Sequence, residues 1–221
     1  MGIYIEALIL FIVLFFAGSL SIGNMHPKTD GFSALREVYR IFLHTIPSLA
    51  LIWYMLIKRR TSNPAANTLR EKDRASLVPC KNDLVSGLIA FPCLLLTGFI
   101  FAFLASFADG SASQISLHLP ESVGGWIILS ISVFFSAYLE ESFFRFYFLT
   151  GRKEFNLSLT HIVIFSTALF SICHIYEGLW GILNSVISGL ILAIIFLRYK
   201  SLHGIAIAHG LYNMAVYIIK R

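Results

Sequence analysis

Charged residues are scarce in this chain. The 17 Lys and Arg and the 12 Asp and Glu make up 13% of its 221 residues, whereas an ordinary soluble domain carries about 25%. Hydrophobic residues make up 57%, and the mean hydropathy is +0.77. This composition excludes an ordinary soluble globular domain and indicates a polytopic integral membrane protein.

Cysteines and the familiar catalytic motifs are also few or missing. Cys80, Cys93 and Cys173 are too few and too widely spaced for a disulfide framework or a CxxC metal site. The chain has no HExxH, GxSxG, GxxxxGK[ST] or GxGxxG pattern, which argues against a helical zincin, a serine hydrolase and a nucleotide-binding protein. The net charge of +5 lies in short loops, so we expect no nucleic-acid partner.

Long apolar segments recur along the chain. A helix needs about 20 apolar residues to cross the hydrocarbon core of a bilayer. The sequence predicts seven such segments: Tyr4–Ile22, Arg40–Ile57, Leu84–Phe107, Gly125–Thr150, Leu157–Ile175, Leu179–Arg198 and Leu202–Ile219. We therefore expect an all-α bundle of about seven transmembrane helices that forms a single integral membrane domain over residues 1–221.

Basic residues are concentrated in the loops after the second, fourth and sixth segments, and the loop after the third segment has none. The positive-inside rule then predicts a cytoplasmic N-terminus. The largest group is the basic loop Lys58–Lys81, which also suits binding to anionic lipid head groups. We favour topology as the explanation of this loop.

Three charges interrupt the fourth apolar segment. Each charge at the bilayer centre costs about 2.5–3.5 kcal/mol, so intramembrane charges usually mark functional sites. Glu141 and Arg145 are four residues apart on one helical face and are expected to form an ion pair. Adjacent Glu140 is turned by about 100° and lacks a local partner, which makes it a candidate base for water activation. A purely structural network of salt bridges is the alternative.

The fifth and seventh segments add two histidines and an amide. His174 follows Phe170 by one helical turn, and His209 and Asn213 share one face of the last segment. Together with the carboxylate of Glu140, these side chains predict one polar cavity inside the membrane, although a lone histidine is more often structural.

Helix geometry brings Glu140 and His174 to one depth. A hairpin that turns near Asn156 places them within about 3 Å along the bundle axis. His209 fits less well, because it lies only about nine residues past the turn expected at Lys200. For all three to meet, the sixth segment must tilt or a turn must enter the membrane.

These residues resemble the three-part signature of the CPBP family, which comprises the CAAX proteases and the bacteriocin-processing enzymes. The family patterns EExxxR, FxxxH and HxxxN read here as Glu140–Arg145, Phe170–His174 and His209–Asn213. The resemblance covers about residues 125–215, which we interpret as a CPBP-like catalytic core. Each motif alone is weak, but three motifs in order, each in an apolar segment, are specific.

The resemblance implies hydrolysis of a peptide bond within the bilayer. By motif position, the implied roles are Glu140 as the base that activates water, His174 as its assistant, His209 and Asn213 as oxyanion stabilisers, and Glu141 and Arg145 as supporting residues. Glu140, His174 and His209 also form a possible zinc ligand set with an open position. We favour a metal-free glutamic mechanism, because Asn is a poor zinc ligand and carboxylate–histidine pairs activate water unaided.

The predicted function is therefore that of an intramembrane endopeptidase acting on a membrane-associated protein or peptide in the lipid bilayer. The alternative is a non-catalytic bacteriocin-immunity or partner-binding membrane protein that keeps the site as structure. A small transporter is disfavoured, because the chain shows no internal repeat. The short loops are typical of a compact prokaryotic protein, so we expect a multi-pass protein of a bacterial or archaeal cell membrane.

Overall fold

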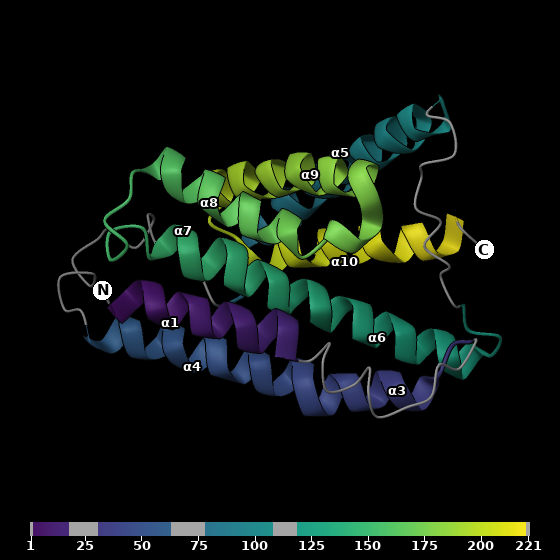
Figure 1. Ribbon diagram of the computed structural model, residues 1–221, viewed down its shortest axis with the longest axis horizontal. Coiled ribbons are helices and arrows are strands. Elements are labelled where there is room, and N and C mark those ends of the chain that lie inside the picture. Colours follow the sequence, from purple (N-terminus) through teal and green to yellow (C-terminus); the bar gives the residue numbers. More distant parts are fainter. Residues whose placement is uncertain (1, 18–30, 63–77, 108–118, 220–221) are drawn as a thin grey trace.

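The computed structural model describes residues 2–17, 31–62, 78–107 and 119–219, and within these ranges it is a bundle of helices (Figure 1). The helical elements are α1 (Gly2–Phe11), η1 (Ile12–Ala17), α3 (Ala34–Tyr39), η2 (Arg40–Thr45), α4 (Ile46–Ser62), α5 (Lys81–Phe107), α6 (Val123–Glu140), η5 (Glu141–Tyr147), α7 (Phe148–Thr150), α8 (Leu159–Ile172), η6 (Ile175–Glu177), α9 (Gly178–Tyr199) and α10 (Leu202–Ile219). Elements η1, η2 and η5 are π-helical stretches that continue the neighbouring α-helices, and η6 is a 3₁₀ turn.

The predicted helical membrane bundle is confirmed, and each of the seven predicted segments contains a helix. Five helical runs of the described residues are long and apolar enough to cross a membrane: Ala34–Lys58, Lys81–Phe107, Val123–Thr150, Ile175–Tyr199 and Leu202–Ile219. Gly2–Phe15 and Leu159–Ile172 are apolar but shorter. Most of the basic loop lies outside the described residues, and the orientation of the N-terminus stays a prediction.

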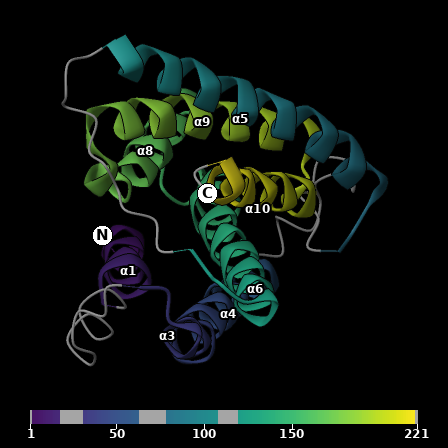
Figure 2. The ribbon, with the colours of Figure 1, turned by 90° about the vertical axis from the view of Figure 1, so that its right-hand side faces the viewer.

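The helices form two groups with a central pair between them. Viewed end-on in Figure 2, α5, α8 and α9 lie on one side and α1, α3 and α4 on the other, with α6 and α10 in the middle. Helix α10 packs against both α5 and α6, so it connects the two groups. A residue that projects from α6 or α10 can therefore lie inside the bundle.

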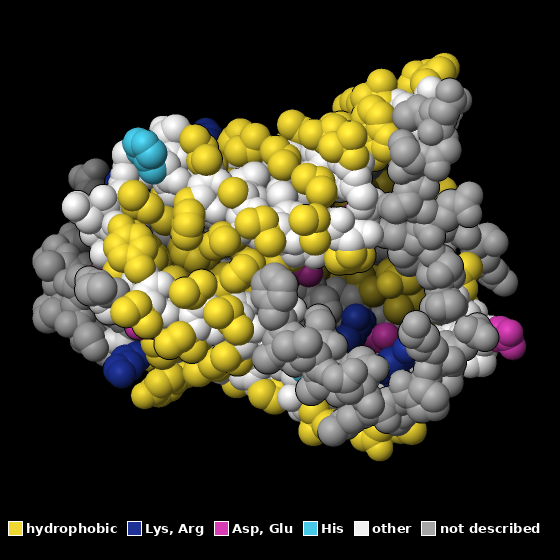
Figure 3. Space-filling view, viewed as in Figure 1, with side chains coloured by type: hydrophobic (Ala, Val, Ile, Leu, Met, Phe, Trp, Pro, Cys, Tyr) yellow, Lys and Arg dark blue, Asp and Glu magenta, His cyan; other side chains and the backbone are white. Residues whose placement is uncertain are grey.

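The outer surfaces of the helices are apolar. On α5, for example, Leu84, Leu88, Leu96 and Phe103 are all exposed. Figure 3 shows hydrophobic side chains over most of the described part of one face. In water this surface would be unfavourable, but it suits lipid tails, as expected of an integral membrane protein.

The core lies around the second half of the fourth predicted segment. All seven residues of η5 are buried, as expected for a helix that is hydrophobic on every side. Phe143 stacks against Tyr147 and meets Phe148 edge-on, with ring centroids 5.5 and 5.0 Å apart. Phe144 packs against Phe15 of η1 and Phe170 of α8. This aromatic packing fixes the segment that carries the paired glutamates.

The turns expected near Asn156 and Lys200 are confirmed. Asn156 and Lys200 have positive φ angles of 49° and 56°, and Gly178, next to Glu177, has a φ of 75°. Lys200 ends α9 in a left-handed conformation, and its N–H donates to the carbonyl of Phe196. This tight turn starts α10 two residues later.

The turn between α8 and α9 lies part-way along the length of the bundle (Figure 1). Helix α8 has 14 residues, too few to cross the hydrocarbon core. Figure 1 shows the turn part-way along α6 instead of level with its end. His174 and His209 line the same cavity, and the position of this turn relative to the bilayer stays a prediction. His174 itself lies just past α8, in this turn, and not within the helix as predicted.

Gly204 brings α10 into backbone contact with α5. A Cβ atom at this position would lie 2.2 Å from the carbonyl oxygen of Asp83 and 2.1 Å from Oγ of Ser86. The hydroxyl of Ser86 also donates to the Asp83 carbonyl and lies 2.9 Å from Oγ of Ser201. Any side chain at Gly204 must therefore push the two helices apart.

We expect Gly204→Ala to destabilise the protein by about 2 kcal/mol or more, because overpacking against backbone cannot be relieved by a change of rotamer. Gly124→Ala is the matched control, since its Cβ would meet no atom within 4 Å. Thermal unfolding in detergent micelles would compare both variants with the unsubstituted protein. Equal midpoints for the two variants would contradict the close contact.

Candidate active site

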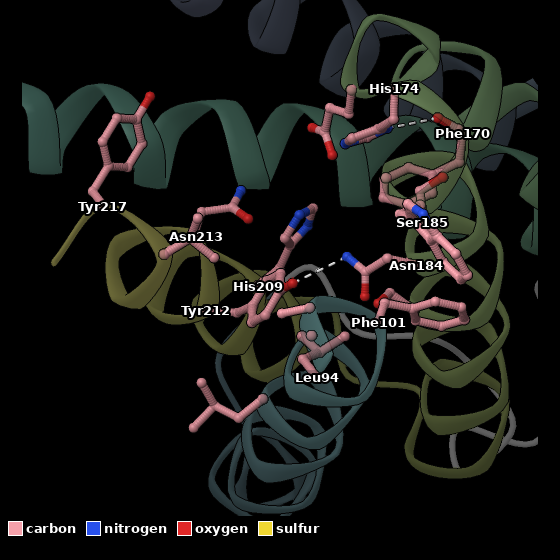
Figure 4. Close-up of a pocket in the computed structure, with 18 of the residues that line it drawn as sticks. Leu94, Phe101, Phe170, His174, Asn184, Ser185, His209, Tyr212, Asn213 and Tyr217 are labelled. Atoms are coloured by element: carbon pink, nitrogen blue, oxygen red, sulfur yellow. Dashed lines mark hydrogen bonds between the residues drawn. The ribbon is translucent and has the colours of Figure 1, made fainter. Parts of the chain in front are cut away.

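The predicted polar residues meet at one cavity of about 490 Å³ between α5, α6, α9 and α10, a size typical of ligand sites. Glu140, His174, His209 and Asn213 all line it. Figure 4 shows the His209 ring and the Asn213 amide on the same side of α10, facing the region of His174. Three motifs that are far apart in the sequence thus contribute to a single site.

Glu141 lies beneath the cavity and bridges two basic groups. Its Oε2 lies 3.3 Å from Nε of Arg145, as predicted, and its Oε1 lies 2.8 Å from Nδ1 of His209. The side chains of Glu141 and Arg145 are 0% and 1% exposed. Because an ionised carboxylate only accepts hydrogen bonds, Nδ1–H of His209 is the donor. This bond occupies Nδ1, so Nε2 is the ring nitrogen of His209 that is left for other partners.

Glu140 has a different environment from its neighbour. Its Oε2 lies 3.9 Å from Nε2 of His209 and has no hydrogen-bond partner among the described residues. Its side chain is 20% exposed and faces the cavity. The structure therefore separates the two adjacent acids into a paired, buried carboxylate and a carboxylate that is available to a ligand.

Phe170 holds the ring of His174 and connects it to the ion pair. Nδ1–H of His174 donates to the Phe170 carbonyl at 2.9 Å, and the two ring centroids are 4.6 Å apart. The guanidinium carbon of Arg145 lies over the Phe170 ring, 4.2 Å from its centroid. The ring of His209 meets Phe170 edge-on at 5.9 Å. The backbone bond thus leaves Nε2 of His174 as the nitrogen available for chemistry.

Gly210 brings α10 close to α6. A Cβ atom there would lie 2.5 Å from the ring of Phe134, so a larger residue would move His209 and Asn213 away from Glu140. The close packing of α10 against α6 therefore explains why a glycine stands between the two polar positions of the last motif.

Sequence reasoning missed three polar residues that line the cavity. Asn184 donates from Nδ2 to the hydroxyl of Tyr212 at 3.0 Å, and that hydroxyl packs against Gly98 of α5. Arg40 of η2 reaches the same cavity from the other helix group. The available signal was the presence of Arg40 and Asn184 at or within apolar segments, where polar side chains need a partner or a function.

The described residues contain no preformed cluster of ligands for the alternative metal site. Within the described ranges, no three His, Cys, Asp or Glu side chains lie close enough together to hold a metal ion. Glu140, His174 and His209 line one cavity but do not converge on one point.

The two neighbouring glutamates give a sharp test of this geometry. We expect Glu141→Gln to lower the free energy of unfolding by about 3–5 kcal/mol, because it leaves the buried Arg145 without its counter-charge. Glu140→Gln is the matched change at the next residue and removes no hydrogen bond within the described structure, so we expect a change below about 1 kcal/mol. Unfolding in mixed micelles with increasing SDS would measure both.

A contradiction would be equal destabilisation by the two substitutions. In that case Glu140 would also belong to the structural ion network, and the distinction between the two acids would be wrong.

One family model matches this part of the chain. Residues 122–215 match the model described as "Type II CAAX prenyl endopeptidase Rce1-like". This stretch of the chain contains all three motifs. No curated protein and no solved structure matches the chain. The resemblance to the CPBP family is confirmed by this match: residues 122–215 of this integral membrane protein, less than half of the chain, are similar to the Rce1-like type II CAAX prenyl endopeptidases.

Proposed function

We propose that this protein is an intramembrane endopeptidase in which Glu140, assisted by histidine, activates water to hydrolyse a peptide bond. The observation that carries the proposal is the contrast between the two acids: Glu141 is paired with Arg145 and His209, whereas Glu140 lines the cavity and its buried Oε2 has no hydrogen-bond partner among the described residues. The family match to prenyl endopeptidases supports the reaction class.

Glu140 and His209 are suitably spaced to share one water molecule. With 3.9 Å between Oε2 and Nε2, a water at about 2.8 Å from each atom completes a triangle of ordinary hydrogen bonds. Glu140 accepts the proton of that water as its oxygen attacks the peptide carbonyl, and it then returns the proton to the leaving amine. His174, whose Nδ1 is occupied by Phe170, assists from the other side through Nε2.

The carbonyl oxygen becomes negatively charged during the attack and requires hydrogen-bond donors. The amide of Asn213 supplies one donor from the cavity wall. His209 supplies another from Nε2–H when both of its ring nitrogens carry a proton. Removing one such donor typically lowers kcat by about 10²–10³.

The opposite wall of the cavity suits a substrate from the membrane. Leu94, Phe101, Ala102 and Ala105 of α5 line it with apolar groups. An apolar side chain or lipid group beside the scissile bond would be removed from water there. The proposed substrate is therefore a membrane-associated protein or peptide.

We expect Glu140→Gln to abolish cleavage, because the amide cannot accept the proton of water at neutral pH. Terminal-peptide proteomics of membranes that contain the unsubstituted protein or Glu140→Gln at equal abundance would detect the new chain ends that depend on this carboxylate. These ends would also identify the substrates and the cleavage site.

Glu121→Gln is the control, because Glu121 is exposed before the start of α6 and makes the same chemical change away from the cavity. We expect its set of chain ends to equal that of the unsubstituted protein. Identical sets for Glu140→Gln and Glu121→Gln, with both proteins inserted, would contradict the proposed enzyme and favour the non-catalytic alternative.

For the metal-free mechanism, we expect cleavage by the purified protein to persist after dialysis against EDTA and 1,10-phenanthroline, because no step passes through a metal. Added Zn²⁺ is expected to leave the rate unchanged or to lower it by binding Glu140 and a histidine. Loss of activity with the chelators and its recovery with Zn²⁺ would instead assign Glu140, His174 and His209 as ligands.

A further inference from the structure

Two polar side chains on α9 carry buried atoms without a hydrogen-bond partner among the described residues: Oδ1 of Asn184 and Oγ of Ser188. Both side chains line the cavity, and Ser188 is only 5% exposed. Buried polar groups in folded proteins are nearly always hydrogen-bonded, to protein or to ordered water. These two atoms therefore indicate a ligand that forms hydrogen bonds inside the protein.

Ser185, which lies between them in the sequence, shows the contrast. It also lines the cavity, but its hydroxyl donates to the carbonyl of Ile182 at 2.8 Å. The amide of Asn184 is half satisfied, because Nδ2 donates to the hydroxyl of Tyr212 at 3.0 Å, a bond that crosses from α9 to α10 (Figure 4). This bond fixes the orientation of the amide and leaves its oxygen for a ligand.

Ser188 lies close to the proposed catalytic residues. The next residue along α9, Gly189, packs so tightly against Phe170 that an added Cβ atom would lie 3.1 Å from the ring. The same ring contacts the rings of His174 and His209, with centroids 4.6 and 5.9 Å apart. Phe170 thus connects the two histidines to the part of α9 that carries Ser188.

The spacing and chemistry of the two side chains suit water. Asn184 and Ser188 are four residues apart on α9, so they share one face with about 5–6 Å between their Cβ atoms. Water bridges such a gap with hydrogen bonds of about 2.8 Å. Neither side chain is charged, and together they offer one donor and several acceptors. The cavity of about 490 Å³ has room for several molecules, since each occupies about 30 Å³.

Arg145 adds a donor beside the same stretch of α9. Its Nη2 donates to the carbonyl of Gly189 at 3.3 Å, while its buried Nη1 has no partner among the described residues. Gly189 adjoins Ser188 in the sequence. Several unsatisfied polar atoms therefore lie along one short part of this helix, which favours a group of internal water molecules over an apolar ligand.

We propose that Asn184 and Ser188 form a water-binding site that keeps a reserve of water beside Glu140. This inference rests on the proposed hydrolysis, in which every turnover consumes one water molecule. The outer surface of the bundle faces lipid tails, where water is scarce. Water held on α9 replaces the consumed molecule from within the cavity.

Two substitutions of equal shape separate water binding from packing. Ser188→Thr keeps the hydroxyl, and Ser188→Val has a methyl group in its place. Hydroxyl-radical footprinting would be applied to both in the Glu140→Gln protein in detergent micelles, because radicals formed from bound water oxidise the side chains next to it. Phe170 is the reporter, since it is 2% exposed and beyond the reach of bulk water. We expect its oxidation to be several-fold lower with Ser188→Val than with Ser188→Thr.

Asn184→Leu tests the second residue of the site through Tyr212. Loss of bound water is expected to lower the oxidation of Tyr212 several-fold. A purely structural role of the bond between the two side chains predicts the opposite, because Tyr212 would be freer and oxidised more. Ser185→Ala is the matched control, since its hydroxyl is already bonded to a carbonyl, and we expect the oxidation of Phe170 to stay unchanged.

Thermal unfolding gives a readout that depends on neither oxidation nor cleavage. A buried hydroxyl without any partner would make Ser188→Val more stable than Ser188→Thr, because the unpaired group is removed. A hydroxyl bonded to water makes Ser188→Thr at least as stable as Ser188→Val. We expect the second result.

Cleavage is measured separately in the protein with Glu140 intact, with a substrate found by the terminal-peptide experiment. We expect Ser188→Val to lower kcat about tenfold relative to Ser188→Thr, the factor for one lost hydrogen bond, and to leave KM unchanged.

Equal oxidation of Phe170 in the two Ser188 variants would overturn the inference, as would a higher unfolding midpoint for Ser188→Val. Equal kcat values for the two variants would also overturn it. If the difference in oxidation is present but the protein with Glu140 intact cleaves no substrate, the proposed catalysis fails and the water-binding site stands.

Discussion

The arrangement of the site depends on the buried carboxylate of Glu141. It neutralises Arg145 and also accepts a hydrogen bond from His209, so one side chain joins the π-helical stretch η5 to α10. In a membrane no water can replace either partner at low cost. The same contact fixes which nitrogen of His209 faces the cavity. A supporting residue thereby sets both the packing of two helices and the chemistry available beside Glu140.

Two adjacent carboxylates acquire opposite roles because a helix turns between them. Glu141 points into the ion network, and Glu140 points into the cavity. Pairs of acids in contrasting environments are the arrangement that general acid–base chemistry requires. The aromatic packing of η5 keeps the two directions distinct, since Phe143 and Phe144 are fully buried on neighbouring faces. A buried, paired acid at the start of η5 and an acid that lines the cavity at the end of α6 are thus adjacent in the sequence.

The inserted turn between α8 and α9 gives the cavity its depth. Because α8 is only 14 residues long, His174 lies in a turn part-way along the bundle, where the Phe170 carbonyl and ring orient it. The turn also ends the polar region on one side, while Arg40 and Ser132 extend it on the other. The result is an elongated cavity with polar side chains on α6 and α10 and an apolar wall on α5.

The seven helical segments, the turns near Asn156 and Lys200, and the Glu141–Arg145 pair follow from the sequence alone, because apolar length and helical spacing are local properties. The motif residues could be named for the same reason. Their meeting in one cavity, the bond from Glu141 to His209, the inserted turn and the place of Arg40 were decided only by tertiary structure. These features depend on how far one helix is shifted and rotated against another, and no local pattern along a single chain records that shift.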